Sequence, residues 1–215
     1  MSATAASRNA LRTGTILLVF ACVGTAILAF THQSTEPTIM RGQQAEKLAL
    51  LSQVLPAALH DNDLLSSQQS VPPDDLLGTR KASTVWLARR AGQFSGVVLE
   101  AIAPDGYSGD ISLLIGIDAN GNVTGVRVTA HHETPGLGDY IEYAKSTWID
   151  QFVGKSLATP PPKHWKVIKD GGVFDARAGA TITPRAVVRA VKSALEYFAK
   201  HRAEFNAPPA REPQA

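Results

Sequence analysis

The chain has 215 residues, of which 44% are hydrophobic and 19% are charged, enough for one packed domain and an appended segment. The chain has 21 Lys and Arg residues and 19 Asp and Glu residues, so its net charge is close to zero. No long-range field therefore attracts polyanions, and we expect no nucleic-acid partner. The single cysteine, Cys22, excludes an intrachain disulfide and any cysteine-based zinc or iron–sulfur site within the chain.

The first predicted element is a membrane-spanning helix over residues 13–31. This run is uncharged and mainly apolar, and it has roughly the 17 to 20 residues that a spanning helix needs. Arg8 and Arg12 precede the run, whereas Glu36 is the first charged residue after it. By the positive-inside rule we expect residues 1–12 to be cytoplasmic, the helix to cross the bacterial inner membrane once, and the remaining chain to be periplasmic.

Two alternatives remain for this segment, a cleaved signal peptide and a lipoprotein signal ending at Cys22. A cleaved signal usually has a shorter apolar run and a small-x-small exit, which Ala29-Phe30-Thr31 matches poorly. Cys22 lies in the middle of the run, which is a poor position for lipidation. We therefore interpret the segment as a retained helix.

Residues 32–95 are predicted to form a membrane-proximal helical and loop region. An amphipathic helix over residues 39–55, with leucines at helical spacing, continues from the anchor. Pro56 ends or bends this helix, and residues 60–80 have the Asn, Asp, Ser and Pro content of an irregular loop.

Three runs rich in Val, Ile and Leu predict the strands of an antiparallel meander. They span residues 96–102, 111–117 and 123–130. Asn120-Gly121 separates the last two and is a strong hairpin signal, because both residues tolerate positive φ. In the last run valines alternate with Arg127 and Thr129, which predicts one buried face and one wet face.

Two helices are predicted after the strands. Residues 140–152 carry an apolar side, and residues 186–198 repeat apolar side chains at three- and four-residue steps. Residues 201–215 are predicted to be a disordered tail. Strands followed by helices predict an α+β fold, in which the N-terminal transmembrane helix precedes one domain over residues 96–200 with an antiparallel sheet and flanking helices.

The segment that carries the most chemical information is residues 175–184, directly before the last helix. Pro184 fits the first helical turn, where its missing N–H is not needed, and this makes Thr183 the expected N-cap residue. Thr181 then lies just ahead of a helix N-terminus, where free N–H groups and the helix dipole stabilise a phosphate. The small residues before Thr181 let a bulky ligand approach the backbone. Such loops also begin many helices that bind nothing, so the residues alone leave both interpretations open.

This segment resembles the flavinylation signature Asp-x-x-(Ser/Thr)-Gly-Ala-(Thr/Ser) of the FMN-binding domains in Rnf-type and sodium-pumping quinone reductase complexes. The matching residues are Asp175, Gly179, Ala180 and Thr181, whereas Ala178 departs from the signature because it lacks the usual hydroxyl. The resemblance implies that FMN is covalently attached to Thr181 through a phosphoester. It also implies a dedicated flavin transferase, which takes the FMN from FAD with the help of Mg²⁺ during maturation.

A second stretch, residues 131–139, resembles the Glu-Thr-Pro-Gly-Leu-Gly segment of the same family. Pro135 and the glycines hold a tight turn, whose amides and Thr134 hydroxyl can face a polar ligand edge. His131 and His132 would suggest a metal, but adjacent strand residues point to opposite faces, so we expect none. The residues expected to contact the cofactor are Glu133, Thr134, Gly136, Leu137, Gly179, Ala180 and Thr183.

The resemblance covers roughly residues 96–200 and indicates a G subunit of an Rnf-type complex. It implies an electron carrier that couples electron transfer between ferredoxin and NAD to ion translocation, with the other subunits of a membrane complex as partners. Because the flavin performs the redox step, no catalytic acid or base is expected. The alternatives are a C-type subunit of a sodium-pumping quinone reductase, a membrane-anchored flavin-binding sensor or assembly module, and a structural subunit without a cofactor.

Overall fold

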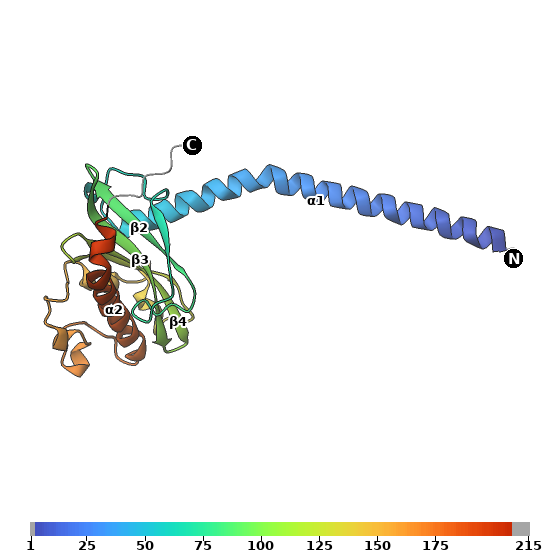
Figure 1. Ribbon diagram of the computed structural model, residues 1–215. Helices are drawn as coiled ribbons and strands as arrows, with labels where there is room; N and C mark the ends of the chain where they lie inside the picture. Colours follow the sequence, from blue (N-terminus) through green and yellow to red (C-terminus); the bar gives the residue numbers. More distant parts are fainter. Residues whose placement is uncertain (1–2, 208–215) are drawn as a thin grey trace. The chain divides into compact units, whose positions relative to one another are not determined.

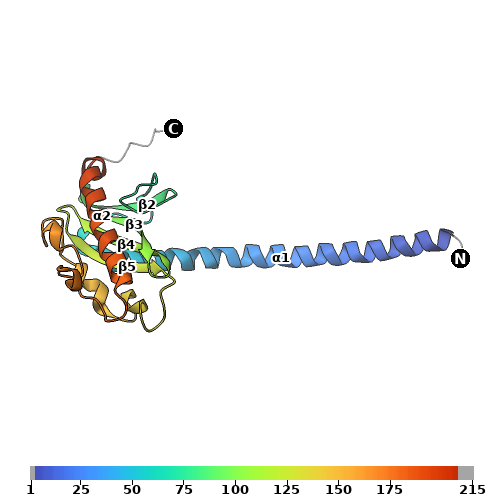
Figure 2. The same ribbon diagram turned by 90° about the horizontal axis from the view of Figure 1, so that it is seen from below.

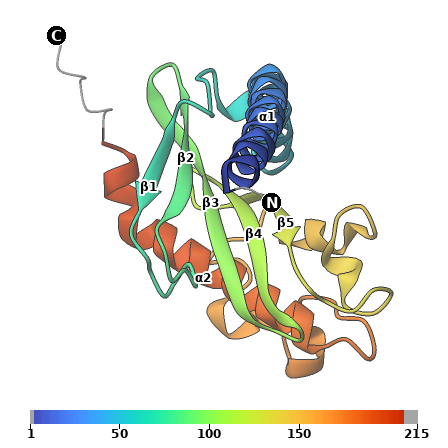
Figure 3. The same cartoon turned by 90° about the vertical axis from the view of Figure 1, so that its right-hand side faces the viewer.

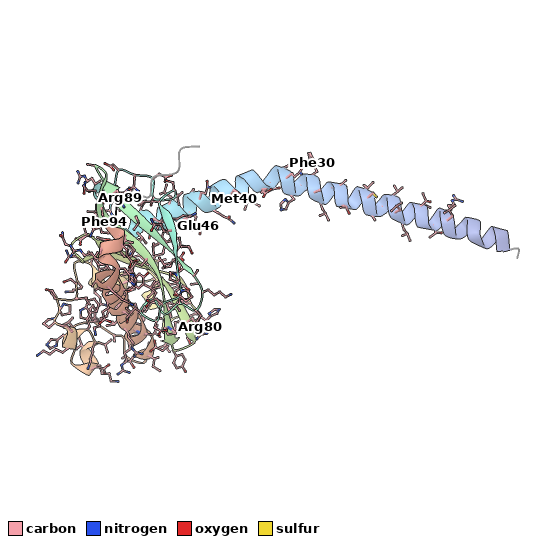
Figure 4. The ribbon with its side chains drawn as sticks, viewed as in Figure 1. Phe30, Met40, Glu46, Arg80, Arg89 and Phe94 are labelled. Atoms are coloured by element: carbon pink, nitrogen blue, oxygen red, sulfur yellow. The ribbon has the colours of Figure 1, made fainter. Side chains whose placement is uncertain are left out.

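The computed structural model describes residues 3–207, and the chain divides into two compact units, Met1–Lys47 and Leu48–Ala215. The first unit holds most of helix α1 (Ala3–Val54), shown in Figure 1. Within α1, Leu11–Glu36 is long and apolar enough to cross a membrane. Its large apolar side chains are exposed, as Phe30 in Figure 4 illustrates. The prediction of one apolar N-terminal helix is confirmed.

The second unit is built on a five-stranded antiparallel sheet in which each strand pairs with its neighbours in sequence (Figure 3). The strands are β1 (Gln68–Val71), β2 (Ser83–Arg90), β3 (Gln93–Gly106), β4 (Gly109–Asp118) and β5 (Val123–Ala130). In the β4–β5 turn Gly121 has a φ of 89°, and Asp118 accepts hydrogen bonds from two backbone N–H groups of the turn. The predicted α+β fold and the hairpin at Asn120-Gly121 are confirmed.

Strands β1 and β2 lie within residues 32–95, where we expected only helix and loop. The burial of β2 does not alternate, because both of its faces are covered and four consecutive residues are buried. Val85 packs in the main core, whereas Trp86 packs in a smaller cluster on the opposite face. The folded unit therefore begins at Leu48, well before the expected boundary at residue 96.

Helix α2 (Ile182–Phe205) packs along one face of the sheet and supplies much of the main core (Figures 2 and 3). Its predicted apolar residues are all buried: Val187, Val191, Ala194, Leu195 and Phe198. Near its end, Phe198 and Phe205 stack on Phe94 of β3. Because these contacts extend the helix to Phe205, the prediction of a tail from residue 201 is wrong for its first five residues. Residues 208–215 of that prediction lie outside the described residues.

The opposite face of the sheet is covered by the last turns of α1, which belong to the second unit. Leu51, Val54 and Leu55 are fully buried in this cluster. The approach is close, because a Cβ atom added at Gly116 would lie 2.2 Å from the Val54 carbonyl oxygen. One added at Gly125 would lie 2.7 Å from the Val54 Cα atom.

Arg127 of β5 was expected on the wet face of the sheet, and this prediction is wrong. The residue is only 8% exposed. Its guanidinium group hydrogen-bonds Gln53 at 3.0 Å, pairs with Asp150 at 3.3 Å and lies 3.8 Å from the ring centroid of Tyr143. Neighbouring elements therefore cover a polar side chain that strand alternation alone assigns to solvent.

The helix predicted over residues 140–152 is also corrected. The segment forms two short 3₁₀ helices, η2 (Asp139–Ile141) and η3 (Thr147–Phe152). Between them Ser146 is extended, and its hydroxyl oxygen caps η3 by accepting the Trp148 N–H. Of the predicted apolar side, the fully buried residues are Ile141, Ile149 and Phe152. The remaining 3₁₀ helices are η1 (Ala57–Leu59), η4 (Pro162–His164) and η5 (Ile168–Asp170).

Candidate functional site

A pocket of about 150 Å³ opens where the first turn of α2, the β3–β4 turn and the turn after β5 meet. We call it the helix-end pocket. Seven of the eight predicted site residues line it: Glu133, Thr134, Leu137, Gly179, Ala180, Thr181 and Thr183. Gly136 is not among the lining residues. The structure thus brings together the two stretches that the sequence singled out.

The loop before α2 is held at its start by side chains of η3. Trp148 Nε1 donates a hydrogen bond to the Asp175 carbonyl oxygen at 2.7 Å, and Gln151 Oε1 accepts the Asp175 N–H at 2.8 Å. Further along, Gly179 has a φ of 87°, in the left-handed region that glycine adopts without steric cost. A side chain added there would reach only Leu137, at 3.6 Å. Hydrogen bonds therefore hold the loop backbone in place, while the space beside Gly179 is nearly empty.

Tyr140 of η2 ties the other end of the same loop. Its hydroxyl donates to the Ala180 carbonyl oxygen and accepts the Arg177 N–H, both at 3.3 Å. The Arg177 guanidinium lies 4.8 Å from the centroid of the Tyr140 ring. Burial raises the pKa of Tyr140 above its ordinary value, against a smaller lowering by its contacts with Arg177. The hydroxyl consequently stays neutral and can both donate and accept.

The two threonines at the start of α2 have different environments. Thr181 occupies the N-cap position, is half-buried, and makes no side-chain cap hydrogen bond. We expected Thr183 to be the N-cap residue, and this is wrong, because α2 already begins at Ile182. Thr183 is 1% exposed and its hydroxyl donates to Glu133 Oε2. Pro184 lies in the first turn, as predicted.

A second hollow, the loop hollow, lies against the same loop and shares Gly179 and Thr181 with the helix-end pocket. Lys169 and Arg177 also line it. The N–H groups of the first helical turn have no partner within α2, and the helix dipole adds partial positive charge at the same place. The surroundings of Thr181 therefore suit an anion such as a phosphate.

Glu133 forms the floor of the helix-end pocket and is 4% exposed. Its Oε1 atom accepts the Ser108 N–H at 3.0 Å, and its Oε2 atom accepts the Thr183 hydroxyl. Glycines leave room for this carboxylate: a Cβ atom at Gly106 would lie 2.9 Å from Oε1, and one at Gly138 would lie 2.8 Å from Oε2. The carboxylate therefore joins three segments of the chain at one point.

A charged network supports the turn after β5. Lys145 Nζ donates to Asp139 at 2.8 Å and to Glu142 at 2.9 Å, and His131 Nε2 lies 2.7 Å from Glu142. The hydrogen bond from Lys145, followed by the Gly136 N–H, lowers the pKa of Asp139. Lys145, followed by His131, lowers the pKa of Glu142. The predicted residue Gly136 lies in the turn beside this network.

Three residues line the pocket that were not on the predicted list. They are Tyr107, Gly138 and Ile182. Gly138 and Ile182 lie in the two segments that carried the resemblance, whereas Tyr107 lies in the β3–β4 turn, outside both of them. Tyr107 and Ile182 are 66% and 45% exposed, which leaves an apolar rim at the pocket. Trp165, by contrast, is buried in the main core.

Comparisons with known proteins agree with this geometry. The FMN-binding domain family matches residues 106–196, and the RnfG N-terminal region family matches residues 1–54. The chain is 49% identical to the G subunit of the ion-translocating oxidoreductase complex of Pseudomonas aeruginosa over 204 residues, which cover 95% of each chain.

Two further relatives are G subunits of the same kind of complex. The relative from Shewanella oneidensis is 46% identical over 199 residues, covering 93% of this chain and 94% of the relative. The relative from Aliivibrio fischeri is 46% identical over 194 residues, covering 90% and 92%. The chain therefore belongs to the family of G subunits of ion-translocating oxidoreductase complexes and contains an FMN-binding domain.

Proposed function

We propose that the chain carries FMN esterified through its phosphate to Thr181 and serves as an electron-carrier subunit of its complex. In this role it relays electrons with neighbouring subunits while the complex couples electron transfer between ferredoxin and NAD to ion translocation. The α1 segment anchors it once in the bacterial inner membrane, with the N-terminus in the cytoplasm and the flavin domain in the periplasm. Arg8 and Arg12 ahead of the span, without a matching basic cluster directly behind it, support this orientation.

The observation that carries the proposal is the Thr181 hydroxyl. It is half-buried at the mouth of α2, makes no cap hydrogen bond, and borders both the helix-end pocket and the loop hollow. Thr183, two residues later, is buried and bonded to Glu133, so a transferase could not reach it without unfolding the turn. Of the two hydroxyls, only that of Thr181 suits an ester.

The residues around Thr181 fit the parts of FMN. The helix N-terminus with Lys169 and Arg177 suits the phosphate. Tyr107, Leu137 and Ile182 offer exposed apolar surface to a planar ring. When bound, the flavin supplies one- and two-electron chemistry, while the protein sets its position and electrostatic surroundings.

During maturation Thr181 acts as a nucleophile. By its resemblance to the family, its oxygen forms a bond to the phosphorus of the FMN half of FAD, the pyrophosphate bond breaks, AMP leaves, and the hydroxyl proton goes to a base of the transferase. The covalent tether is useful in an exported domain, because FMN is made in the cytoplasm and a dissociated cofactor would be lost. Afterwards Thr181 has no chemical role other than attachment.

The proposal is tested by measuring whether FMN is covalently attached to the chain. The full chain, exported together with a flavin transferase, should give a fluorescent band on a denaturing gel and an intact mass larger by one esterified FMN. Thr181→Ala should abolish both signals, whereas Thr181→Ser should retain them because the hydroxyl remains. Thr129→Ala, an exposed threonine of β5, is the matched control and should load normally. A fluorescent Thr181→Ala chain would refute the assignment.

A flavin-binding sensor or assembly module would share the attachment but not the relay. Rapid mixing of the purified complex with its electron donor separates the two roles. A relay flavin must be reduced and reoxidised at least as fast as the complex turns over. The relatives described above favour the Rnf-type complex over the C-type subunit of a quinone reductase.

A further inference from the structure

The most unusual group in the helix-end pocket is the carboxylate of Glu133. A charge at 4% exposure is costly unless it is compensated. Among the described residues no Lys, Arg or His side chain forms an ion pair with Glu133. Its compensation consists of two donors, the Ser108 N–H and the Thr183 hydroxyl. The pocket floor therefore carries a negative charge that neighbouring cations do not cancel.

The structure holds this charge in one place. Its two oxygens are bonded to different segments, the β3–β4 turn and the first turn of α2. Its own N–H donates to His131 Nδ1 at 2.9 Å, which fixes the backbone at the same residue. Because Gly106 and Gly138 lack side chains, the two carboxylate oxygens can lie close to the backbone at these positions. Both oxygens of the carboxylate are therefore held by hydrogen bonds.

Building on the FMN attachment proposed above, we propose that Glu133 sets the midpoint potential of the flavin by holding a fixed negative charge beside it. Glu133 and Thr181 line the same pocket, so a flavin tethered at Thr181 lies in the field of the carboxylate. Reduction adds electrons to the flavin ring, and a nearby anion disfavours that added charge. Because Glu133 is only 4% exposed, water and salt screen its charge weakly. The carboxylate therefore lowers the potential and makes the reduced flavin a stronger reductant.

The experiment measures the midpoint potential of the loaded full chain in detergent by spectroelectrochemical titration. In Glu133→Gln the side chain keeps its length, its oxygen can still accept the Ser108 N–H, and its amide can donate to the Thr183 oxygen. Only the charge is removed, so we expect normal flavin loading and a potential shifted in the positive direction. Glu133→Asp keeps the charge and should lie closer to the unchanged chain than to the Gln variant.

Glu196→Gln is the matched control, because it removes one carboxylate from the surface of α2, where Glu196 pairs with Lys192. Its potential should equal that of the unchanged chain. An equal potential in Glu133→Gln would overturn the proposal, and so would a Gln variant that loads no flavin, since the charge would then serve loading. Absence of covalent flavin from the unchanged chain would instead refute the attachment to Thr181, which intact mass reports separately.

Discussion

The loop that presents Thr181 depends on one buried hydroxyl, and removing it is a sharp test of the site. Tyr140→Phe keeps the ring, which is 1% exposed, and deletes both hydrogen bonds of its hydroxyl to the loop backbone. A net hydrogen bond contributes about 0.5–1.5 kcal/mol, and both bonds here are long, at 3.3 Å. In the variant, the N–H of the exposed residue Arg177 can form a hydrogen bond to water. The carbonyl of Ala180, a buried residue, loses its partner. We expect a loss of about 1–2 kcal/mol in the free energy of unfolding.

Urea unfolding of the full chain, followed by tryptophan fluorescence, measures this loss. All three tryptophans lie in the second unit, so the part of α1 in the first unit is silent in this assay. Tyr143→Phe is the control, because Tyr143 is 47% exposed and no hydrogen bond from its hydroxyl is found in residues 3–207. Tryptic cleavage at Arg177 should be faster in Tyr140→Phe alone. Equal stability and equal cleavage in the two variants would refute the idea that Tyr140 holds the loop.

Two further predictions concern the turn after β5. Gly138→Ala places a Cβ atom 2.8 Å from Glu133 Oε2, so we expect about 1–3 kcal/mol of destabilisation in urea and reduced flavin loading; full loading at unchanged stability would contradict this. Lys145 lowers the pKa values of Asp139 and Glu142 from 3.8 and 4.5, so their stabilising contribution is present above these values and lost as pH falls below them. Lys145→Gln should therefore flatten the decline in stability as pH falls below about 4.5, and an unchanged pH profile of urea unfolding would count against the network.

Much of the fold was predictable because its local signals are regular. The apolar spacing of α2 and the hairpin signal before β5 placed both elements correctly. β2 was missed because it is buried on both faces, between the main core and the end of α1. The 140–152 segment was predicted as one helix because its apolar spacing imitates an α-helix. Ser146 breaks that helix with an extended backbone, which the pattern cannot reveal.

The residues of the site were predicted from two motifs, but their contacts were not. Spacing made Thr183 the helix cap, whereas its hydroxyl is used by Glu133, which lies fifty positions earlier in the chain. Arg127 was assigned to solvent because strand alternation cannot show its hydrogen bond to Gln53, which lies 74 positions earlier in the chain. Such long-range pairings depend on how the chain folds, and a local pattern carries no information about them.

On the proposed attachment of FMN to Thr181, the tethering of the 175–181 loop has a consequence for when the cofactor can be installed. Trp148, Gln151 and Tyr140, which hold that loop, come from an earlier part of the chain and must pack before the acceptor takes its shape. A transferase that recognises this shape would pass over a chain still emerging from the export machinery. Flavin loading would then act as a quality checkpoint, so that only correctly matured subunits enter the assembly as redox-active components.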